Sequence, residues 1–138
     1  METRIRYLGG VKFEAETRGH RLLCDQPHEN GGADEAMTPP ELMLASLGTC
    51  AAFYAVQYLK ARSLPPEGVD IHVEAEKAMQ PPRIGSFRIT VGVPGVVEER
   101  HREGLMRAVR GCLIHNTLLN RPDIDVAIHL GADASLAA

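Results

Sequence analysis

The chain of 138 residues is 44% hydrophobic and 24% charged, and it carries a net charge of −3 at pH 7. This length predicts one domain over residues 1–138, large enough to bury about two-thirds of its unfolded surface. The acidic balance, with no basic run that alternates with aromatic residues, argues against a nucleic-acid partner. No basic and then apolar leader follows Met1, and the three cysteines cannot all pair within one chain. We therefore expect a cytoplasmic protein.

The first third of the chain reads as a small sheet that leads into a long helix. Apolar and charged residues alternate over 4–24, which predicts three strands, and glycines at 9–10 and 18–19 mark two hairpin turns. A polar loop over 28–37 comes next, and an apolar helix begins after Thr38. Its most apolar run falls short of the ~18 residues that span a bilayer, so no membrane partner is expected.

The remaining elements complete a mixed domain. The periodicity predicts strands around 71–75 and 87–93, helices over about 97–111 and 113–119, and a last strand at 124–130. The order β-β-β-α-β-β-α-α-β indicates an α+β fold. A helix that is apolar on most of its circumference must be wrapped on several sides. One three-stranded sheet cannot do this, so a second sheet, from this chain or another subunit, is expected.

The start of the long helix admits two interpretations of Glu41. Thr38 and Glu41 have the spacing of a capping box, in which each side chain bonds to the backbone of the other. Alternatively, Glu41 orients a cation near Cys50. Nine residues at ~100° each place Glu41 and Cys50 on opposite faces of a straight helix, ~13 Å apart along its axis. The second interpretation therefore requires a break in the helix, for which Gly48 is the natural place.

The cysteines are the candidate reactive groups. Unpaired cysteine is often plain core filling, but Cys50 and Cys112 each close an apolar helical segment. Two such cysteines on different helices can form a disulfide if their Cα atoms come within about 7 Å. Cys24 has no such partner and is expected to be inert. Cys112-x-x-His115 has metal-ligand spacing, but one pair does not make a metal site, and we interpret His115 as a helix surface residue.

These segments resemble a known family. The stretch "GGADEAMTPPELMLASLGTCAAFYAVQYLKARS", followed about sixty residues later by "RGCLIHNTLLN", is similar to the OsmC/Ohr superfamily, and the similarity covers about residues 4–130. The resemblance implies an intertwined homodimer whose long helices lie between two sheets, with active sites at the subunit interface. It also implies a peroxidatic Cys50, a resolving Cys112 and an orienting Glu41. The implied activity is reduction of organic hydroperoxides, without a cofactor, by an external dithiol reductant, as an antioxidant in the oxidative stress response.

Two positions depart from the pattern of that family. Its active hydroperoxidases carry an arginine just after the first glycine pair, where this chain has Val11 and Lys12, and Leu113 follows the second cysteine in place of proline. Lys12, Arg18 and Arg21 are the candidates for the missing charge. The alternative function is therefore a non-catalytic dimer of the same fold that binds a small hydrophobic ligand at the subunit interface.

Overall fold

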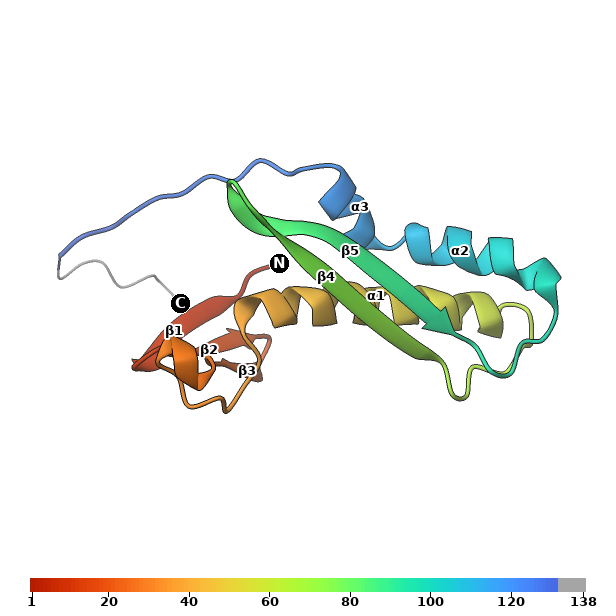
Figure 1. The fold of residues 1–138 in the computed structure, drawn as a ribbon, viewed down its shortest axis with the longest axis horizontal. Coiled ribbons are helices and arrows are strands. Elements are labelled where there is room, and N and C mark those ends of the chain that lie inside the picture. Colours follow the sequence, from red (N-terminus) through yellow and green to blue (C-terminus); the bar gives the residue numbers. More distant parts are fainter. Residues whose placement is uncertain (132–138) are drawn as a thin grey trace.

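The computed structural model describes residues 1–131 and consists of an N-terminal sheet, a long helix, a β-hairpin and two further helices (Figure 1). The predicted domain extends to 138, and its last residues, 132–138, lie outside the described range. The two sheets are separate, and the three-stranded one has the order β1-β2-β3. The elements in chain order are β1 (Arg4–Gly9), β2 (Lys12–Thr17), β3 (His20–Cys24), α1 (Pro39–Lys60), β4 (Asp70–Met79), β5 (Pro82–Gly92), α2 (Arg102–Arg110) and α3 (Leu113–Leu119).

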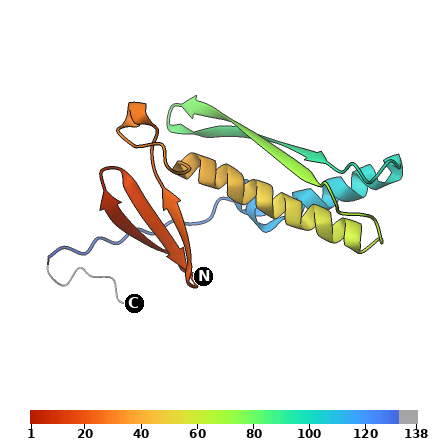
Figure 2. The ribbon, with the colours of Figure 1, turned by 90° about the horizontal axis from the view of Figure 1, so that it is seen from below.

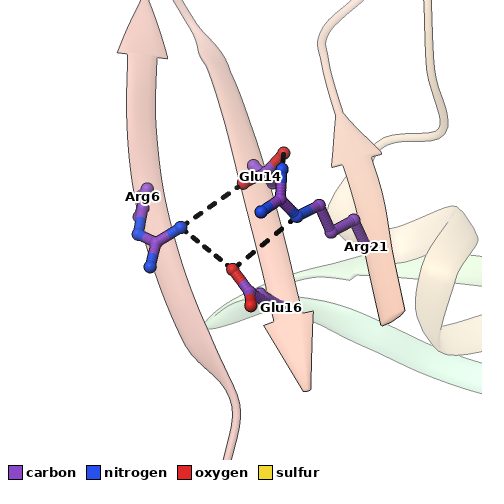
Figure 3. Close-up of polar contacts among 4 residues, drawn as sticks. All are labelled: Arg6, Glu14, Glu16 and Arg21. Atoms are coloured by element: carbon purple, nitrogen blue, oxygen red, sulfur yellow. Dashed lines mark hydrogen bonds and ion pairs between the residues drawn. The ribbon is translucent and has the colours of Figure 1, made fainter. Parts of the chain in front are cut away.

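The N-terminal sheet confirms the three predicted strands and both turns. Gly9, Gly10, Arg18 and Gly19 all have positive φ, as tight hairpin turns between right-twisted strands require. Because side chains alternate across a strand, the sheet has a charged face and an apolar face. On the charged face, one arginine from each outer strand flanks the two β2 residues Glu14 and Glu16 (Figure 3). Arg6 Nη1 lies 2.9 Å from Glu16 Oε2, and Arg21 Nε lies 3.8 Å from the same oxygen. The apolar face, with Ile5, Tyr7, Phe13 and Leu22, remains exposed.

The core of the chain lies between α1 and α2, which run side by side with the β4–β5 hairpin on one face of α1 (Figures 1 and 2). Residues four apart on α1 form the buried stripe, which packs against two buried residues of α2. The buried hydrophobic residues are Leu47, Ala51, Ala55, Leu59, Leu105, Val109 and Cys112. A separate face of α1 meets β4, where Gly48 lets the backbone approach, since a Cβ there would lie 3.0 Å from Val73 Cγ2.

The C-terminal helices agree with the sequence in part. The short helix over 113–119 is confirmed to the residue. The helix predicted over about 97–111 is shorter: a 3₁₀ turn, Glu99–His101, precedes α2, which begins at Arg102. Such tighter turns are common at helix ends, because the first N–H groups lack partners within the helix.

The strand predicted at 124–130 is absent from the described chain. Its alternating apolar residues, Ile124, Val126, Ile128 and Leu130, are 83%, 76%, 79% and 88% exposed. The segment is extended but pairs with no other strand among residues 1–131. A strand is defined by a hydrogen-bonded neighbour, and the alternation of a sequence does not supply one.

The expectation that the apolar run of this helix is too short to span a bilayer also needs correction. α1 has 22 residues and is long and apolar enough to cross a membrane by those two criteria. Only 22% of its most apolar stretch is buried within the chain. α1 nevertheless packs against both α2 and β4 within the chain.

Candidate functional site

The start of α1 is held by the predicted capping box. The Thr38 backbone N–H and its hydroxyl donate to Glu41 Oε2 at 2.7 and 2.8 Å, and the Glu41 N–H donates to Thr38 Oγ1 at 3.5 Å. The Thr38 N–H bond, followed by the hydroxyl bond, lowers the pKa of the Glu41 carboxyl. Glu41 therefore has a structural role at the first turn of the helix.

The predicted break at Gly48 is wrong. α1 is continuous from Pro39 to Lys60, and Gly48 is used for close packing on Val73. The Thr49 hydroxyl donates to the carbonyl oxygens of Ala45, at 2.7 Å, and Ser46, which is compatible with an unbroken helix. Within one chain, Glu41 and Cys50 are therefore not brought together, and a catalytic role of Glu41 stays a prediction.

A pair of variants separates the two roles of Glu41. Thr38→Ala removes the N-cap and is expected to destabilise the protein by about 1 kcal/mol. Glu41→Gln is expected to lower the midpoint of thermal unfolding in the same direction, because it weakens the same capping box. If the activity that the family resemblance implies is present, its loss in Glu41→Gln but not in Thr38→Ala would show that the carboxylate also acts at the thiol.

The structure brings together the two predicted cysteines. Cys50 is half-buried in the middle of α1, whereas Cys112 is fully buried as the N-cap residue of α3. The Cys112 sulfur accepts a hydrogen bond from the His115 N–H at 3.3 Å, and the Cys112 side chain lies near enough to that of Cys50 for the two thiols to interact. Cys24 lies opposite Phe13 in the N-terminal sheet, away from this pair.

The two thiols differ in their surroundings. Burial raises the pKa of Cys112 above its ordinary value. The hydrogen bond from the His115 N–H lowers that pKa in part, and the neighbouring Cys50 side chain raises it further. Cys112 thus keeps its proton at neutral pH. Chemically, the arrangement is one partly accessible thiol beside a buried second thiol, which can join it in a disulfide.

Two of the three candidate cations are engaged elsewhere. Lys12 Nζ forms an ion pair with Glu35, and the hydrogen bond to that carboxylate raises the pKa of Lys12. Arg21 belongs to the charged face of the N-terminal sheet (Figure 3). Arg18 occupies the β2–β3 turn with a φ of 50°.

The loop between β3 and α1 contains a buried carboxylate that the sequence analysis did not identify. Asp25 is 1% exposed and its Oδ2 accepts the N–H groups of Ala33 and Glu35, each at 3.2 Å. Backbone N–H bonds, with that of Gln26 the strongest, lower the pKa of Asp25. Gly32 is required here, since a Cβ would lie 1.7 Å from the Gln26 carbonyl oxygen. An aspartate at a strand end before a Gly-Gly pair is the signal that could have indicated this closed loop.

Two hollows adjoin these elements. A groove of about 790 Å³ runs between β5 and α2, with mostly apolar walls and His115 at one side. A smaller slot of about 390 Å³ lies between α1 and β4, lined by small and aliphatic residues that include Gly48 and Val73. Among residues 1–131, no three His, Cys, Asp or Glu side chains are placed to hold a metal ion together.

Known proteins resemble this chain in sequence and in fold. Protein YhfA of Escherichia coli (strain K12) is 26% identical over 85 residues, which cover 61% of this chain and 60% of that protein, so the chain spans about 60% of the length of the curated relatives that it matches. A solved structure from Psychrobacter arcticus, a candidate osmotic stress induced and detoxification response protein, matches with a TM-score of 0.77 and 18% identity over 83% of this chain and 85% of that one.

A further solved structure carries a more specific description. The organic hydroperoxide resistance protein OsmC from Legionella pneumophila matches with a TM-score of 0.57 and 22% identity, over 86% of this chain and 89% of that chain. At these identities the solved structures establish the fold alone. The model of the family described as OsmC-like protein matches residues 31–127, from the loop before α1 to the extended segment after α3. The chain is therefore a member of the OsmC-like family, within the OsmC/Ohr superfamily.

Proposed function

We propose that this protein is a two-cysteine thiol peroxidase that reduces organic hydroperoxides. The observation that carries the proposal is the contact between Cys50 and Cys112, two thiols from separate helices of which one is half-exposed and the other buried. The family membership supports it, because the superfamily includes proteins described by resistance to organic hydroperoxides.

The reaction proceeds in three balanced steps. The Cys50 thiolate attacks the terminal oxygen of the hydroperoxide, the O–O bond breaks, and the alkoxide leaves with a proton as an alcohol. Cys50 is thereby oxidised to a sulfenic acid. The Cys112 thiolate attacks that sulfur and displaces hydroxide, which takes up a proton to form water, and a Cys50–Cys112 disulfide is left. An external dithiol then reduces the disulfide by exchange and is itself oxidised.

The order of the two thiols follows from their burial. A peroxide must reach the attacking sulfur, and Cys50 is the more exposed of the pair. Cys112 is fully buried, so it suits the second step, in which its target is already bound to the protein and no peroxide has to reach it. The exposed side chains of Met43 and Phe53, on the side of α1 that carries Cys50, would favour alkyl hydroperoxides over hydrogen peroxide, at about 25 cal/mol per Å² of carbon chain buried.

Disulfide formation is expected to depend on pH through Cys112. Because the pKa of Cys112 is raised, its thiolate fraction at neutral pH is small and grows roughly tenfold for each pH unit until that pKa is reached. After one equivalent of cumene hydroperoxide, the rate of Cys50–Cys112 disulfide formation between pH 6 and 8 should therefore rise steeply with pH. The measurement is acid quenching followed by mass spectrometry of the linked peptides. A rate independent of pH, or no linked peptide, would contradict the assignment of Cys112 as the resolving residue.

A homodimer is part of the proposal. Met43 and Phe53, on the side of α1 that carries Cys50, are 39% and 58% exposed, and the apolar face of the N-terminal sheet is uncovered as well. Exposed apolar surfaces of this kind on a folded chain are typical of protein interfaces. A second copy would cover α1 from the side that its own chain leaves open and would complete an apolar pocket at Cys50.

Members of this family are soluble, which fits the packing of α1 as a core helix against α2 and β4. We place the protein in the cytoplasm, where a disulfide that is formed and reduced in each cycle has its dithiol reductant.

The raised pKa of Cys112 and the apolar slot between α1 and β4 favour the alternative, a non-catalytic dimer that binds a small hydrophobic ligand. In that case both thiols are structural. A co-purified apolar compound in the native mass spectrum, together with a Cys50 that resists alkylation at neutral pH, would select this function over the peroxidase.

A further inference from the structure

A cluster of side chains joins the C-terminal end of α1 to the start of α2. The Tyr58 hydroxyl oxygen lies 3.2 Å from His101 Nδ1, within hydrogen-bond distance, and the two rings meet edge to face with centroids 6.1 Å apart. Cζ of Arg62 lies over the Tyr58 ring, 3.7 Å from its centroid. On the other side of the imidazole, the buried Nε2 is 3.6 Å from Glu98 Oε2, which is too far for a hydrogen bond. The bond to Tyr58 therefore orients His101.

Gly104 makes room for the Tyr58 ring. A Cβ at this position would lie 2.3 Å from the Tyr58 hydroxyl oxygen and 2.4 Å from Cε2, far inside the ~3.5 Å at which carbon atoms normally touch. Glycine weakens a helix relative to alanine, and the backbone at Gly104 is ordinary α-helix. The space that Tyr58 occupies is thus a physical reason for glycine at this position.

This cluster and the cysteine pair lie at opposite ends of one helix pair. α1 and α2 run side by side in opposite directions (Figures 1 and 2). Tyr58 follows Cys50 by eight residues of α1, which is about 12 Å of helix. On the facing segment, Gly104 precedes Cys112 by the same number of residues. Because α2 is a continuous helix and one turn residue joins it to Cys112, a displacement of its first turn also moves that cysteine.

We propose that Tyr58, His101 and Gly104, together called the helix spacer, fix the position of α2 along α1. The spacer thereby keeps the Cys112 sulfur within reach of Cys50. This rests on the proposed function, whose second step requires the two sulfurs to meet. A disulfide needs Cβ atoms about 3.5–4.5 Å apart, so a shift of about 1 Å at Cys112 is enough to oppose it. The spacer acts through α2 and not at the sulfurs, so its members are positioning residues.

The reduction potential of the cysteine pair tests the spacer without any peroxide. In a glutathione buffer, glutathione disulfide takes two electrons and two protons from the thiols of Cys50 and Cys112, which leaves their disulfide and two molecules of glutathione. Gly104→Ala pushes the first turn of α2 away from Tyr58. We expect it to lower the equilibrium constant of this exchange about tenfold, which raises the potential by about 30 mV. The measurement is mass spectrometry of the alkylated protein at a series of glutathione ratios.

Two further variants distinguish positioning from loss of stability. Tyr58→Leu added to Gly104→Ala removes the ring atoms that the new methyl group meets, so the double variant should return to within about threefold of the wild-type constant. Ile71→Ala acts on the other face of α1, where Ile71 Cγ2 would lie 3.9 Å from a Cβ at Gly48. It should lower stability but change the constant by less than about twofold, because a loss shared by the reduced and oxidised forms cancels. Equal potentials for the wild type and Gly104→Ala, or an equal shift in Ile71→Ala, would overturn the proposal.

A conservative change tests the hydrogen bond of the spacer. His101→Asn puts an amide where Nδ1 stands and keeps a partner for the Tyr58 hydroxyl, so the constant should stay within about twofold of the wild type. His101→Leu removes that partner and should lower the constant about threefold to fivefold. Equal constants for these two variants would exclude the bond from the spacer.

The glutathione measurement also separates the spacer from the enzyme. A wild type that forms the disulfide between Cys50 and Cys112 in glutathione, with the expected loss in Gly104→Ala, but consumes no peroxide would contradict the proposed peroxidase and leave the spacer intact. A wild type that forms no such disulfide at any glutathione ratio would overturn the spacer itself.

Discussion

Replacing Cys50 with serine is expected to lower the rate of organic hydroperoxide consumption by roughly 10³-fold or more, because the hydroxyl does not ionise near neutral pH and is a poor nucleophile toward the O–O bond. The measurement is consumption of cumene hydroperoxide with a dithiol in excess, followed by loss of the peroxide itself. Cys50 is half-buried on a continuous helix, so the isosteric change should leave the fold intact.

Two further cysteine variants serve as controls for the Cys50→Ser measurement. Cys24→Ser removes a half-buried thiol of the N-terminal sheet and should leave the rate unchanged. Cys112→Ser should still consume one equivalent of peroxide and then hold Cys50 as a sulfenic acid, which dimedone traps. If Cys50→Ser consumes peroxide as fast as the wild type, or if the wild type consumes none, the peroxidase proposal fails.

The largest effect on stability is expected for Leu59→Ala. Leu59 is fully buried at the end of the α1 stripe, in a cluster with Ala55, Leu105 and Val109. Removing its branched end leaves a cavity between α1 and α2 and is expected to lower the free energy of unfolding by about 3 kcal/mol. The midpoint of thermal unfolding should fall by about 10 °C for a domain of this size.

Leu119→Ala is the matched control for this change. Leu119 is 71% exposed at the end of α3, so the same truncation there should cost less than about 0.5 kcal/mol. Both variants should be compared with the wild type at one protein concentration, since the proposed dimer would make the midpoint depend on concentration. Equal losses at the two positions would contradict the assignment of the core to the contact between α1 and α2.

Local signals in the sequence were reliable. The turn glycines at 9–10 and 18–19, the Thr38–Glu41 box and the short helix over 113–119 all depend on hydrogen bonds between residues a few positions apart. Such bonds form wherever the residue types and spacings are right. The candidate cysteines were found in the same way, because each stands at a recognisable point of a helical segment.

Contacts between residues far apart in the sequence could not be predicted from local patterns. A glycine in a helix predicts a weak point, yet Gly48 is where Val73 of β4 packs closely, and the helix does not break. Asp25 looks like an ordinary polar residue until the loop folds around it and its carboxylate collects backbone N–H groups. The alternation at 124–130 is real, but no strand within the described chain pairs with it.

The sequence by itself determined the order of the elements, the start of the long helix and the two thiols worth testing, since periodicity and capping are properties of neighbouring residues. Only the tertiary structure decided that Cys50 and Cys112 touch, that Glu41 stays at the helix start, and that Lys12 and Arg21 are bound to carboxylates. The physical reason is that contacts between separate elements depend on how helices and sheets pack, and packing is settled by the whole chain at once.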